Sequence, residues 1–546
     1  MPVVAVQQYS KGSLRTGSTV EHETQTIAAP TGGLNSSASV IGLSPTDSLL
    51  CENFITRQFG LELRSGYLKW QDNLGDPART IAEFHDRDPV NDKLFAFTEV
   101  GIFDVTLRLE NVTPATPDVT FGFQQALASD IWSHTNFSTN FVSYLCVCSA
   151  GNGYYTYDDA GGWVQHVAGV GAGDIDGTDP VDFDYILEWK RRLWFVKAGE
   201  TSAWYLPVNQ IAGEVREFDF GPFLAHGGSI AAMISWTRDG GNGADDYLVI
   251  TGTEGDVVLY QGTDPNQSVS FGLSGAWYVG GFPVGRRFFE NIGGDVQMLC
   301  SQGLVSLEVL MTGQNIDVAS GLSYKIQEAL TAEFRDRKDD FSWEVLYDSG
   351  NSIVILKVPA KASEDNWAYA AGIHSKGWST LVNMPMVTLS KFGNDLFGSD
   401  ETGVIYKLLS GNNDNVGFSG SEGVSEIAAQ LQTSFLPVGG GNDLKIPQLV
   451  ASVFLAESAP SVNTNVNTEF NFAGATAPAF QQLQGQFLWD TALWDVAYWV
   501  GSSRTFETIH GVEGMGHFMS LRMAVKGKAG TVFTHWRVIY KSGGIM

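Results

Sequence analysis

The stretch YLVITGTEGDVVLYQG, from Tyr247 to Gly262, has the form of a β-hairpin, with two apolar strands joined by a short turn that contains glycine and acidic residues. Six more stretches share this pattern: LFAFTEVGIFDVT from Leu94, YLCVCSAGNGYYTYD from Tyr144, LWFVKAGETSAWYLP from Leu193, MLCSQGLVSLEVLM from Met298, VLYDSGNSIVILKVP from Val345 and LFGSDETGVIYKLLSG from Leu396. Hairpins that recur about every 50 residues are typical of a β-propeller, whereas a sandwich has turns without this longer period. We therefore predict an all-β chain with a six- or seven-bladed propeller over residues 71–424.

The composition agrees with this fold class. The chain has 546 residues, enough for more than one domain, and its 62 glycines and 12% aromatic residues suit strands joined by tight turns. Few helices are expected. One is predicted at about 322–337, where Ile326, Leu330 and Phe334 recur every four residues and form one apolar stripe.

Charge divides the chain into three parts. The net charge is −27, and residues 71–424 carry 47 acidic and 21 basic side chains. Residues 1–70 hold five of each sign, and residues 425–546 hold eight acidic and seven basic. Such an acidic chain lacks the clustered Lys and Arg that neutralise phosphates, which argues against nucleic-acid binding of that kind. We expect the two neutral ends to pack together as one β-rich platform domain.

The N-terminal end of the platform is predicted to begin after a flexible arm at residues 1–31. The platform segment, 32–70, reads GGLNSSASVIGLSPTDSLLCENFITRQFGLELRSGYLKW. Ser44-Pro45-Thr46-Asp47 has the form of a helix start, with Ser44 as N-cap and Asp47 completing a capping box, so a short helix ending near Gly60 is expected. Leu61 and Leu63 then alternate with polar residues as in a strand, and a second strand begins at Tyr67.

The C-terminal end of the platform is predicted over residues 425–546. Two strands joined by a glycine-rich loop are expected around 439–441, followed by a loop-like stretch at 458–486. Trp489, Trp494 and Trp499 are spaced five apart, which fits neither a strand nor a helix and indicates an irregular aromatic segment. The last stretch, 517–544, is predicted to be a hairpin that turns at 526–530 and places Trp536 on one face of its second strand.

No motif with catalytic chemistry is found, so we expect neither an enzyme nor a cofactor. Four cysteines (Cys51, Cys146, Cys148 and Cys300) lack metal-binding spacing and are interpreted as buried, reduced thiols. No signal peptide or membrane-spanning run is recognised. The loop GDIDGTDPVDFD is a weak Ca²⁺ candidate, but it lacks EF-hand spacing, and a solvated turn is the preferred interpretation. Its candidate ligands are Asp174, Asp176, Asp179 and Asp182.

Several stretches resemble the tail nozzle proteins of short-tailed bacteriophages, also called packaged-DNA stabilisation proteins or tail tubular proteins B. At the N-terminal end they are Gly32-Gly33-Leu34-Asn35, Asn53-Phe54 and the run from Gly60 to Tyr67. In the middle it is the helix at about 322–337 set before Trp343. At the C-terminal end they are Trp489-Asp490, Trp494-Asp495 and Trp536-Arg537-Val538-Ile539-Tyr540 before Gly543-Gly544.

The resemblance implies a virion structural protein, assembled in the host cytoplasm and located in the phage tail. Its homo-oligomeric ring, of six copies in the family, would extend the DNA channel below the portal and adaptor rings, retain packaged DNA and open for ejection. Implied partners are the adaptor ring, tail fibre or needle proteins, and viral DNA that passes without sequence-specific binding. Implied assembly residues are Gly33, Leu34, Asn35, Asn53, Gly60, Arg64, Gly66, Tyr67, Trp489, Trp494, Trp499 and Trp536.

Two other function classes fit a propeller. One is a phage or surface adhesin that binds glycans, for which the 15 tryptophans would be suitable residues. The other is a propeller hydrolase that uses two carboxylates, although the abundance of carboxylates in this chain does not identify such a pair. Ring formation, glycan binding or turnover would distinguish the three.

Overall fold

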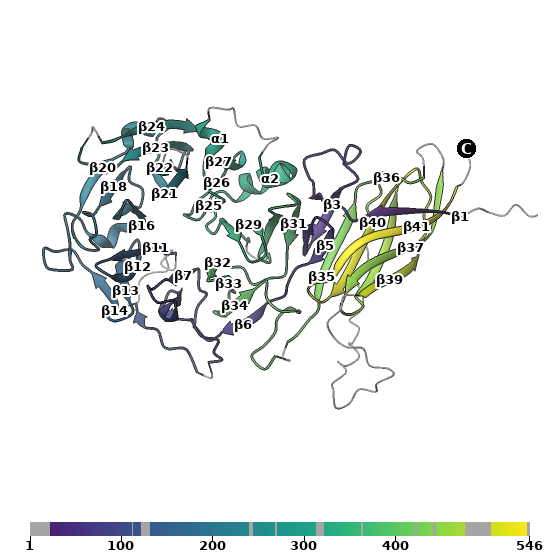
Figure 1. Ribbon diagram of the computed structural model, residues 1–546, viewed down its shortest axis with the longest axis horizontal. Coiled ribbons are helices and arrows are strands. Elements are labelled where there is room, and N and C mark those ends of the chain that lie inside the picture. Colours follow the sequence, from purple (N-terminus) through teal and green to yellow (C-terminus); the bar gives the residue numbers. More distant parts are fainter. Residues whose placement is uncertain are drawn as a thin grey trace, which may run out of the picture.

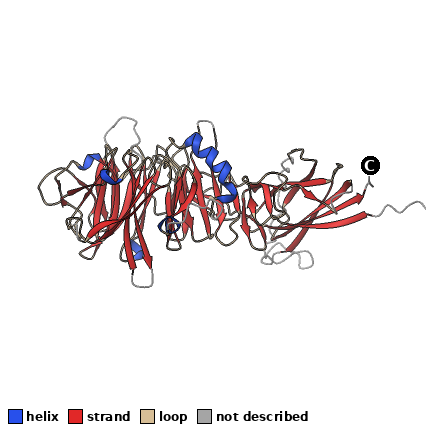
Figure 2. Ribbon diagram, turned by 90° about the horizontal axis from the view of Figure 1, so that it is seen from above, coloured by secondary structure: helices blue, strands red, loops and turns tan. Residues whose placement is uncertain are grey.

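A computed structural model describes residues 22–542 except 112, 122–130, 240–243, 268–269, 313–320, 362–363, 421–422, 440–443 and 475–503. Seven sheets built from the described residues surround a common axis, and a β-sandwich extends from the rim of this ring (Figures 1 and 2). Around the ring, the innermost strand of a sheet contacts the innermost or the second strand of the neighbouring sheet, and the last sheet contacts the first. The chain is therefore a propeller joined to a second β domain, as the hairpin period predicted.

Four of the blades are antiparallel sheets of four strands, which follow one another along the chain from the axis outward. They are β7 (Thr80–Phe84), β8 (Lys93–Phe97), β9 (Gly101–Asp104), β10 (Val119–Thr120); β11 (Ser133–Thr139), β12 (Val142–Ser149), β13 (Gly153–Asp158), β14 (Gly162–His166); β16 (Phe183–Trp189), β17 (Arg192–Lys197), β18 (Ser202–Tyr205), β20 (Arg216–Asp219); and β21 (Ile230–Asp239), β22 (Ala244–Gly252), β23 (Asp256–Gly262), β24 (Phe271–Tyr278).

Blades 5 to 7 depart from this plan. Blade 5 has three strands among the described residues, and helices α1 (Leu307–Met311) and α2 (Gln327–Arg337) contact its outermost strand. The last strand of blade 6 pairs with platform strands, and blade 7 takes its outermost strand from the N-terminal region. The strands are β25 (Phe289–Ile292), β26 (Asp295–Cys300), β27 (Gly303–Ser306); β28 (Glu344–Asp348), β29 (Ile353–Val358), β30 (Trp367–Gly372), β31 (Trp378–Leu381); and β32 (Leu389–Phe392), β33 (Asp395–Ser399), β34 (Ile405–Leu408), β6 (Leu68–Gln71).

The sandwich is built from both ends of the described chain, as the charge map predicted. Its first sheet runs β39 (Arg504–Gly511), β37 (Lys445–Ala456), β41 (Val532–Ser542), β5 (Gly60–Leu63), β4 (Phe54–Arg57), with β1 (His22–Ala28) also paired to β41. Its second sheet continues from blade 6 through β2 (Gly33–Leu34), β3 (Asp47–Glu52), β35 (Ile427–Thr433), β40 (Phe518–Gly527) and β36 (Leu436–Pro437), with β38 (Ser461–Thr468) also on β40. One core of apolar side chains from both ends lies between the sheets.

The remaining elements are short. Strands β15 (Ile175–Asp176) and β19 (Gly213–Glu214) form a two-residue parallel ladder. Single 3-10 turns are η1 (Pro89–Asn91), η2 (Pro180–Asp182), η3 (Gly221–Phe223) and η5 (Tyr324–Ile326). No helix in the described part of the chain has the length and apolar character needed to cross a membrane.

The predicted helix at 322–337 is present as η5 followed by α2, and its stripe of Ile326, Leu330 and Phe334 is buried. The four cysteines are unpaired and buried, as predicted. Burial raises the pKa of Cys51, Cys146 and Cys300 to about 12, because a thiolate in an apolar interior loses its hydration.

Two predictions for the N-terminal region are wrong. The expected helix after Ser44 is instead strand β3, which pairs with β35 on one side and β31 on the other. A helix this short is marginal alone, and the ladder bonds to two neighbouring strands outweigh its capping signal. The expected flexible arm at 1–31 is also too long, because residues 22–28 form β1 along β41.

Two predictions for the C-terminal region are also wrong. The expected hairpin at 517–544 consists of β40 and β41, which belong to different sheets and make an arch across the sandwich. Trp536 lies in a strand as predicted and is buried, but alternation along a strand distinguishes its two faces and does not identify its partner. The loop-like stretch at 458–486 contains strand β38, whose polar sequence SVNTNVNT pairs along β40.

Strand β6 closes the propeller, because it supplies blade 7 with a strand from far away in the sequence. The amide of Lys69 donates to the Val416 carbonyl at 2.9 Å on the side of β6 away from blade 7. We expect Lys69→Pro to remove this bond, leave a carbonyl unpaired at a cost of about 1–3 kcal/mol, and accelerate amide hydrogen exchange in β34 and β6. Lys69→Ala is the matched control and should preserve protection, so equal exchange in both variants would contradict a closing role for β6.

Candidate functional site

Asn53 and Arg64, two of the predicted assembly residues, lie where the sandwich meets the propeller. The Arg64 side chain is fully buried and makes a bidentate ion pair with Asp414, at 2.6 Å from Nη1 and 2.9 Å from Nη2. Asp414 follows the last strand of blade 7, and Arg64 follows β5 of the sandwich. Their ion pair thus fastens one domain to the other.

Asn53 completes this arrangement from the turn between β3 and β4, with a positive φ of 57°. Its side-chain oxygen accepts hydrogen bonds from Arg64 Nε at 2.9 Å and from the amide of Val382 in the propeller at 3.0 Å. Its side-chain nitrogen donates to the carbonyl of Ala428 in the sandwich at 2.7 Å. We call Asn53, Arg64, Val382, Asp414 and Ala428 the joint.

Gly66 and Tyr67 carry the chain from the joint into β6. The Gly66 amide donates to the Gly411 carbonyl at 3.0 Å, and a Cβ at Gly66 would lie 1.8 Å from the Asn413 oxygen. Only glycine therefore fits this close approach of two backbones. The ring of Tyr67 packs edge-on against Tyr406 of blade 7 at 5.6 Å.

A second group of contacts ties the start of the platform to the helical region before α2. Asn35 Nδ2 donates to Asp47 at 2.7 Å, and Lys325 Nζ donates to the other Asp47 oxygen at 2.9 Å and to the Gly32 carbonyl at 2.8 Å. Gly33 has a φ of 71° and lies so close to Trp378 of blade 6 that a Cβ would clash with its backbone. These polar contacts hold β2 against the propeller.

The other predicted assembly residues that the structure describes lie inside the sandwich or at its boundary. Trp536 is buried in the sandwich core, and Gly60 lies under β41, where a Cβ would be 2.5 Å from the Phe533 oxygen. Leu34 packs against both the sandwich core and the largest propeller core. Trp489, Trp494 and Trp499 lie outside the described residues.

The aspartate loop is engaged in local turns. The described residues contain no group of three or more His, Cys, Asp or Glu side chains arranged to hold a metal ion. Asp174 accepts from the Gly171 amide at 2.9 Å, Asp179 caps η2 through the Val181 amide at 3.0 Å, Asp182 pairs with Lys197, and Asp176 lies in β15. The candidate Ca²⁺ ligands therefore serve separate contacts and do not converge.

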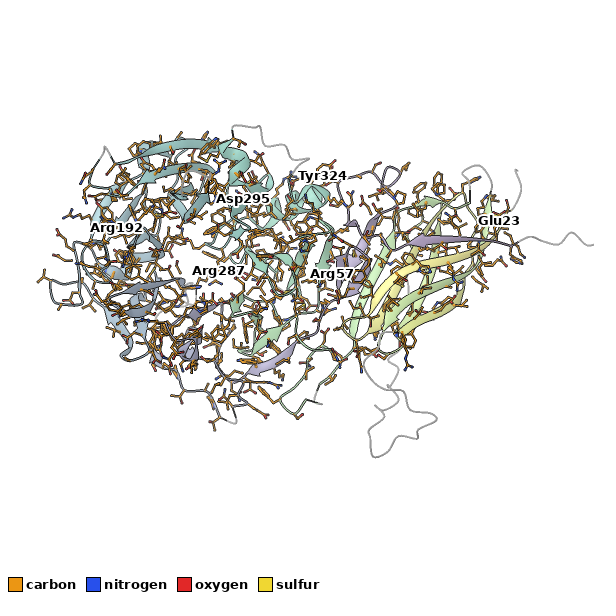
Figure 3. All side chains as sticks on the ribbon, in the orientation of Figure 1. Glu23, Arg57, Arg192, Arg287, Asp295 and Tyr324 are labelled. Carbon is orange, nitrogen blue, oxygen red and sulfur yellow. The ribbon has the colours of Figure 1, made fainter. Side chains whose placement is uncertain are left out.

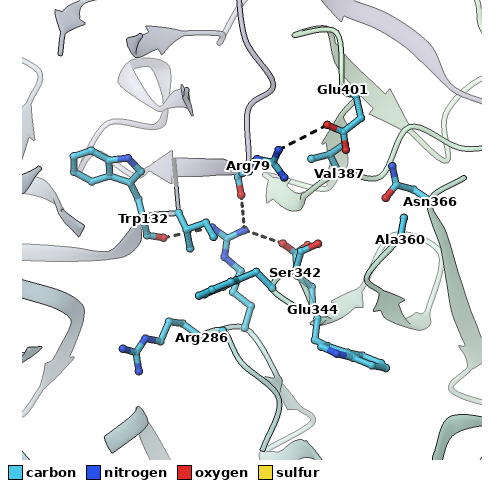
Figure 4. A pocket seen from close by; sticks show the side chains of 14 residues that line it. Arg79, Trp132, Arg286, Ser342, Glu344, Ala360, Asn366, Val387 and Glu401 are labelled. Carbon is cyan, nitrogen blue, oxygen red and sulfur yellow. Dashed lines mark hydrogen bonds and ion pairs between the residues drawn. The ribbon is translucent and has the colours of Figure 1, made fainter. Parts of the chain in front are cut away.

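The propeller axis holds a feature that sequence reasoning missed. Arg286 and Arg287, which we call the hub, precede β25 of blade 5 and point into the centre of the ring (Figures 3 and 4). Arg286 pairs with Asp184 of blade 3 and donates to the Ile230 and Ala231 carbonyls of blade 4. Its guanidinium also lies 5.7 Å from the centre of the Tyr185 ring.

Arg287 contacts the four remaining blades. It donates to Glu344 of blade 6 at 2.9 Å, to the Thr388 hydroxyl of blade 7 at 2.7 Å and to the Thr80 hydroxyl of blade 1 at 2.8 Å. A longer bond of 3.4 Å reaches the carbonyl of Trp132, just before blade 2. Two consecutive arginines thus link blade 5 to the other six blades.

Cavities and buried titratable side chains surround the hub. Three cavities of about 120, 350 and 320 Å³ share Arg286 in their walls. Burial lowers the pKa of His134 to about 3, and the nearby positive charge of Arg287 adds to this shift. Burial also lowers the pKa of Lys357 to about 8, although its ammonium donates to the carbonyls of Ser342 and Val387.

No protein-family model matches the sequence, and no curated protein matches it. Solved structures with some similarity include YCF48 bound to D1 peptide (9% identity, TM-score 0.35, 65% of this chain and 99% of that one). A second is the β-propeller domain of Cps50 (Swd1) from Myceliophteria thermophila (10% identity, TM-score 0.34, 64% of this chain and 98% of that one). A third is PorZ from Porphyromonas gingivalis (13% identity, TM-score 0.33, 71% of this chain and 44% of that one). Similarity at this level carries no argument about function, and the propeller assignment rests on the sheet topology.

The buried ion pair of the joint should contribute measurably to the free energy of unfolding. Asp414→Asn should leave the Arg64 charge buried without its partner and lower the free energy of unfolding by about 3–5 kcal/mol. Glu62→Gln is the matched control, because its ion pair with Arg57 is partly exposed (about a quarter of each side chain) and should contribute less than about 1 kcal/mol. Chemical denaturation measures both, and similar losses would show that Arg64–Asp414 is no more important than a surface pair.

The ion pair between Arg287 of the hub and Glu344 should also affect the stability of the chain. Arg287→Met should leave the buried Glu344 carboxylate without its cation and destabilise the chain by about 3–5 kcal/mol. Replacing both residues, as in Arg287→Met with Glu344→Met, should recover part of that loss because no unpaired charge remains. Thermal unfolding checks this, and a double variant less stable than the single one would rule out a dominant role for the ion pair.

Proposed function

We propose that this chain is a structural subunit of a short-tailed phage tail, the nozzle ring that extends the DNA channel below the portal and adaptor. In this proposal it retains packaged DNA, opens for ejection, acts without catalysis and contacts tail fibre or needle proteins. The observation that carries the proposal is the joint. Asn53, Arg64, Gly66 and Tyr67, from stretches quoted for their resemblance to nozzle proteins, lie together in space and fasten a propeller to a platform made of both chain ends.

The charge map supports the same proposal. The acidic surplus lies in residues 71–424, which form nearly all of the propeller, and the sandwich segments are almost neutral. Acidic walls repel phosphates and let a duplex slide, while a neutral surface suits contact with other protein rings.

The hub constrains where DNA would run. Arg286 and Arg287 project into the centre of the propeller and bond to the surrounding blades, so their side chains would obstruct a duplex along this axis. A DNA channel would therefore lie between copies of the chain, at the centre of a ring, and not through any single propeller.

Electron microscopy of the purified full-length chain, alone and with the adaptor ring of the same phage, tests the proposal. We expect rings with a central opening that bind coaxially to the adaptor. A chain that stays monomeric and is not recruited by the adaptor would overturn the proposal. Glycan-array binding without ring formation would favour the adhesin alternative instead.

A further inference from the structure

Among the described residues, the first sheet of the sandwich has two edges at which no further strand pairs. At the end of the sandwich away from the propeller, its strands run in the order β39, β37, β41, β1. Within the part of the chain that the structure describes, no strand pairs with the outer side of β39 or the outer side of β1. Each therefore presents a row of backbone donors and acceptors that a partner strand could use.

The directions of these strands make the two edges complementary. Each neighbouring pair is antiparallel, so β39 and β41 run one way while β37 and β1 run the other. When a second copy is placed beside the first in the same orientation, β39 of one copy meets β1 of the next in the antiparallel sense. Because four strands are contributed by each copy, this alternation continues through any number of copies.

The registers also place the two edges at the same level of the sheet. Ile509 pairs with Ala451, Ala451 with Arg537, and Arg537 with Thr26, so Ile509 and Thr26 lie on one line across the four strands. Thr508 and Ile27 share the neighbouring line through Ser452 and Trp536. A neighbouring copy displaced sideways would therefore bring residues 507–511 of β39 opposite residues 24–28 of β1. Residues 504–506 of β39 would lie at the level where β5 and β4 continue the sheet, so the pairing is confined to the part of β39 away from the propeller.

Neither edge strand contains a proline or a lysine, two residues that often prevent pairing at an edge. The sequences RTFETIHG of β39 and HETQTIA of β1 each have two threonines and one isoleucine, and their charged residues are Arg504 and Glu507 on β39 and Glu23 on β1. The irregularities of this sheet lie within the β37–β41 ladder and not at the edges. Ile509 is 59% exposed on β39, and Thr26 is exposed on β1.

The second sheet offers no such pair of edges. One side of it ends at β38, but the other continues through β3 and β31 into blade 6 and ends at the propeller axis. Only the first sheet can therefore be extended on both sides at this end of the sandwich, which points to another copy of this chain as the occupant.

We infer that copies of this chain assemble head to tail through antiparallel pairing of β39 in one copy with β1 in the next. The contact is heterologous, since two different edges meet, and such contacts close into a ring when the rotation between copies permits. This inference rests on the proposed ring function and adds the surface by which neighbouring subunits recognise each other.

Cysteine cross-linking of the full chain tests the pairing. The four native thiols are buried, so a thiol-specific bismaleimide should react mainly with introduced cysteines. We expect the double variant Thr26→Cys with Ile509→Cys to give a ladder of covalent oligomers. Each single variant alone should give no cross-linked product, and a mixture of the two single variants should give dimers only.

The control variant Val90→Cys with Ile509→Cys places one thiol on an exposed residue of η1 in the propeller and should give no ladder. Cross-linked dimers from either single variant would mean that like edges meet, and would overturn head-to-tail pairing. Rings seen by microscopy without a ladder would overturn this interface but leave the nozzle proposal standing. A ladder from a chain that the adaptor ring does not bind would keep the interface and reject the nozzle proposal, and a chain that neither cross-links nor forms rings would reject both.

Discussion

The ion pair between Arg64 and Asp414 is the contact on which the arrangement of the two domains depends. Both groups are buried, so the attraction between them must compensate for the hydration they lose, and the net gain in stability is small. The main effect of such an ion pair is to fix the relative position of the two groups. A bidentate contact accepts one relative position of the two side chains, and Asn53 links the same guanidinium to backbone from both domains. The polar contacts thus select one orientation of the sandwich on the propeller.

The shared sheet reinforces that orientation. Blade 6 continues through parallel pairing of β31 with β2 and β3 into the sandwich, so no flexible linker separates the domains at this point. The hub acts similarly within the propeller, since two arginines from one blade hold the other six. Together these contacts favour movement of the two domains as one body.

The architecture could be read from the sequence where it depends on repeated local patterns. The hairpin period predicted the propeller, and the charge map placed both chain ends in one domain. Predictions from local patterns were wrong where contacts with distant residues determine the structure. Asp47 is bound by Asn35 and Lys325 instead of capping a helix. Strands β40 and β41 alternate as the strands of a hairpin do, but they face each other across the sandwich core. Within the joint, the family resemblance identified Asn53 and Arg64 as candidate assembly residues, but it did not identify Asp414. The two arginines of the hub were not identified either. A lone aspartate and a pair of arginines cannot be distinguished in a sequence from ordinary surface residues.

The pairing of the first strand with the last has a consequence for the order of folding. Strand β1 is synthesised early, yet its partner β41 follows almost the whole chain, and β6 likewise waits for β34. At typical rates of 5–20 residues per second, β1 remains without its partner for about 25–100 s. During that time its edge and the apolar residues of β3 to β5 are exposed to other chains. The N-terminal region is therefore the part that waits longest for its partner strands, and completion of both domains is a late event in synthesis.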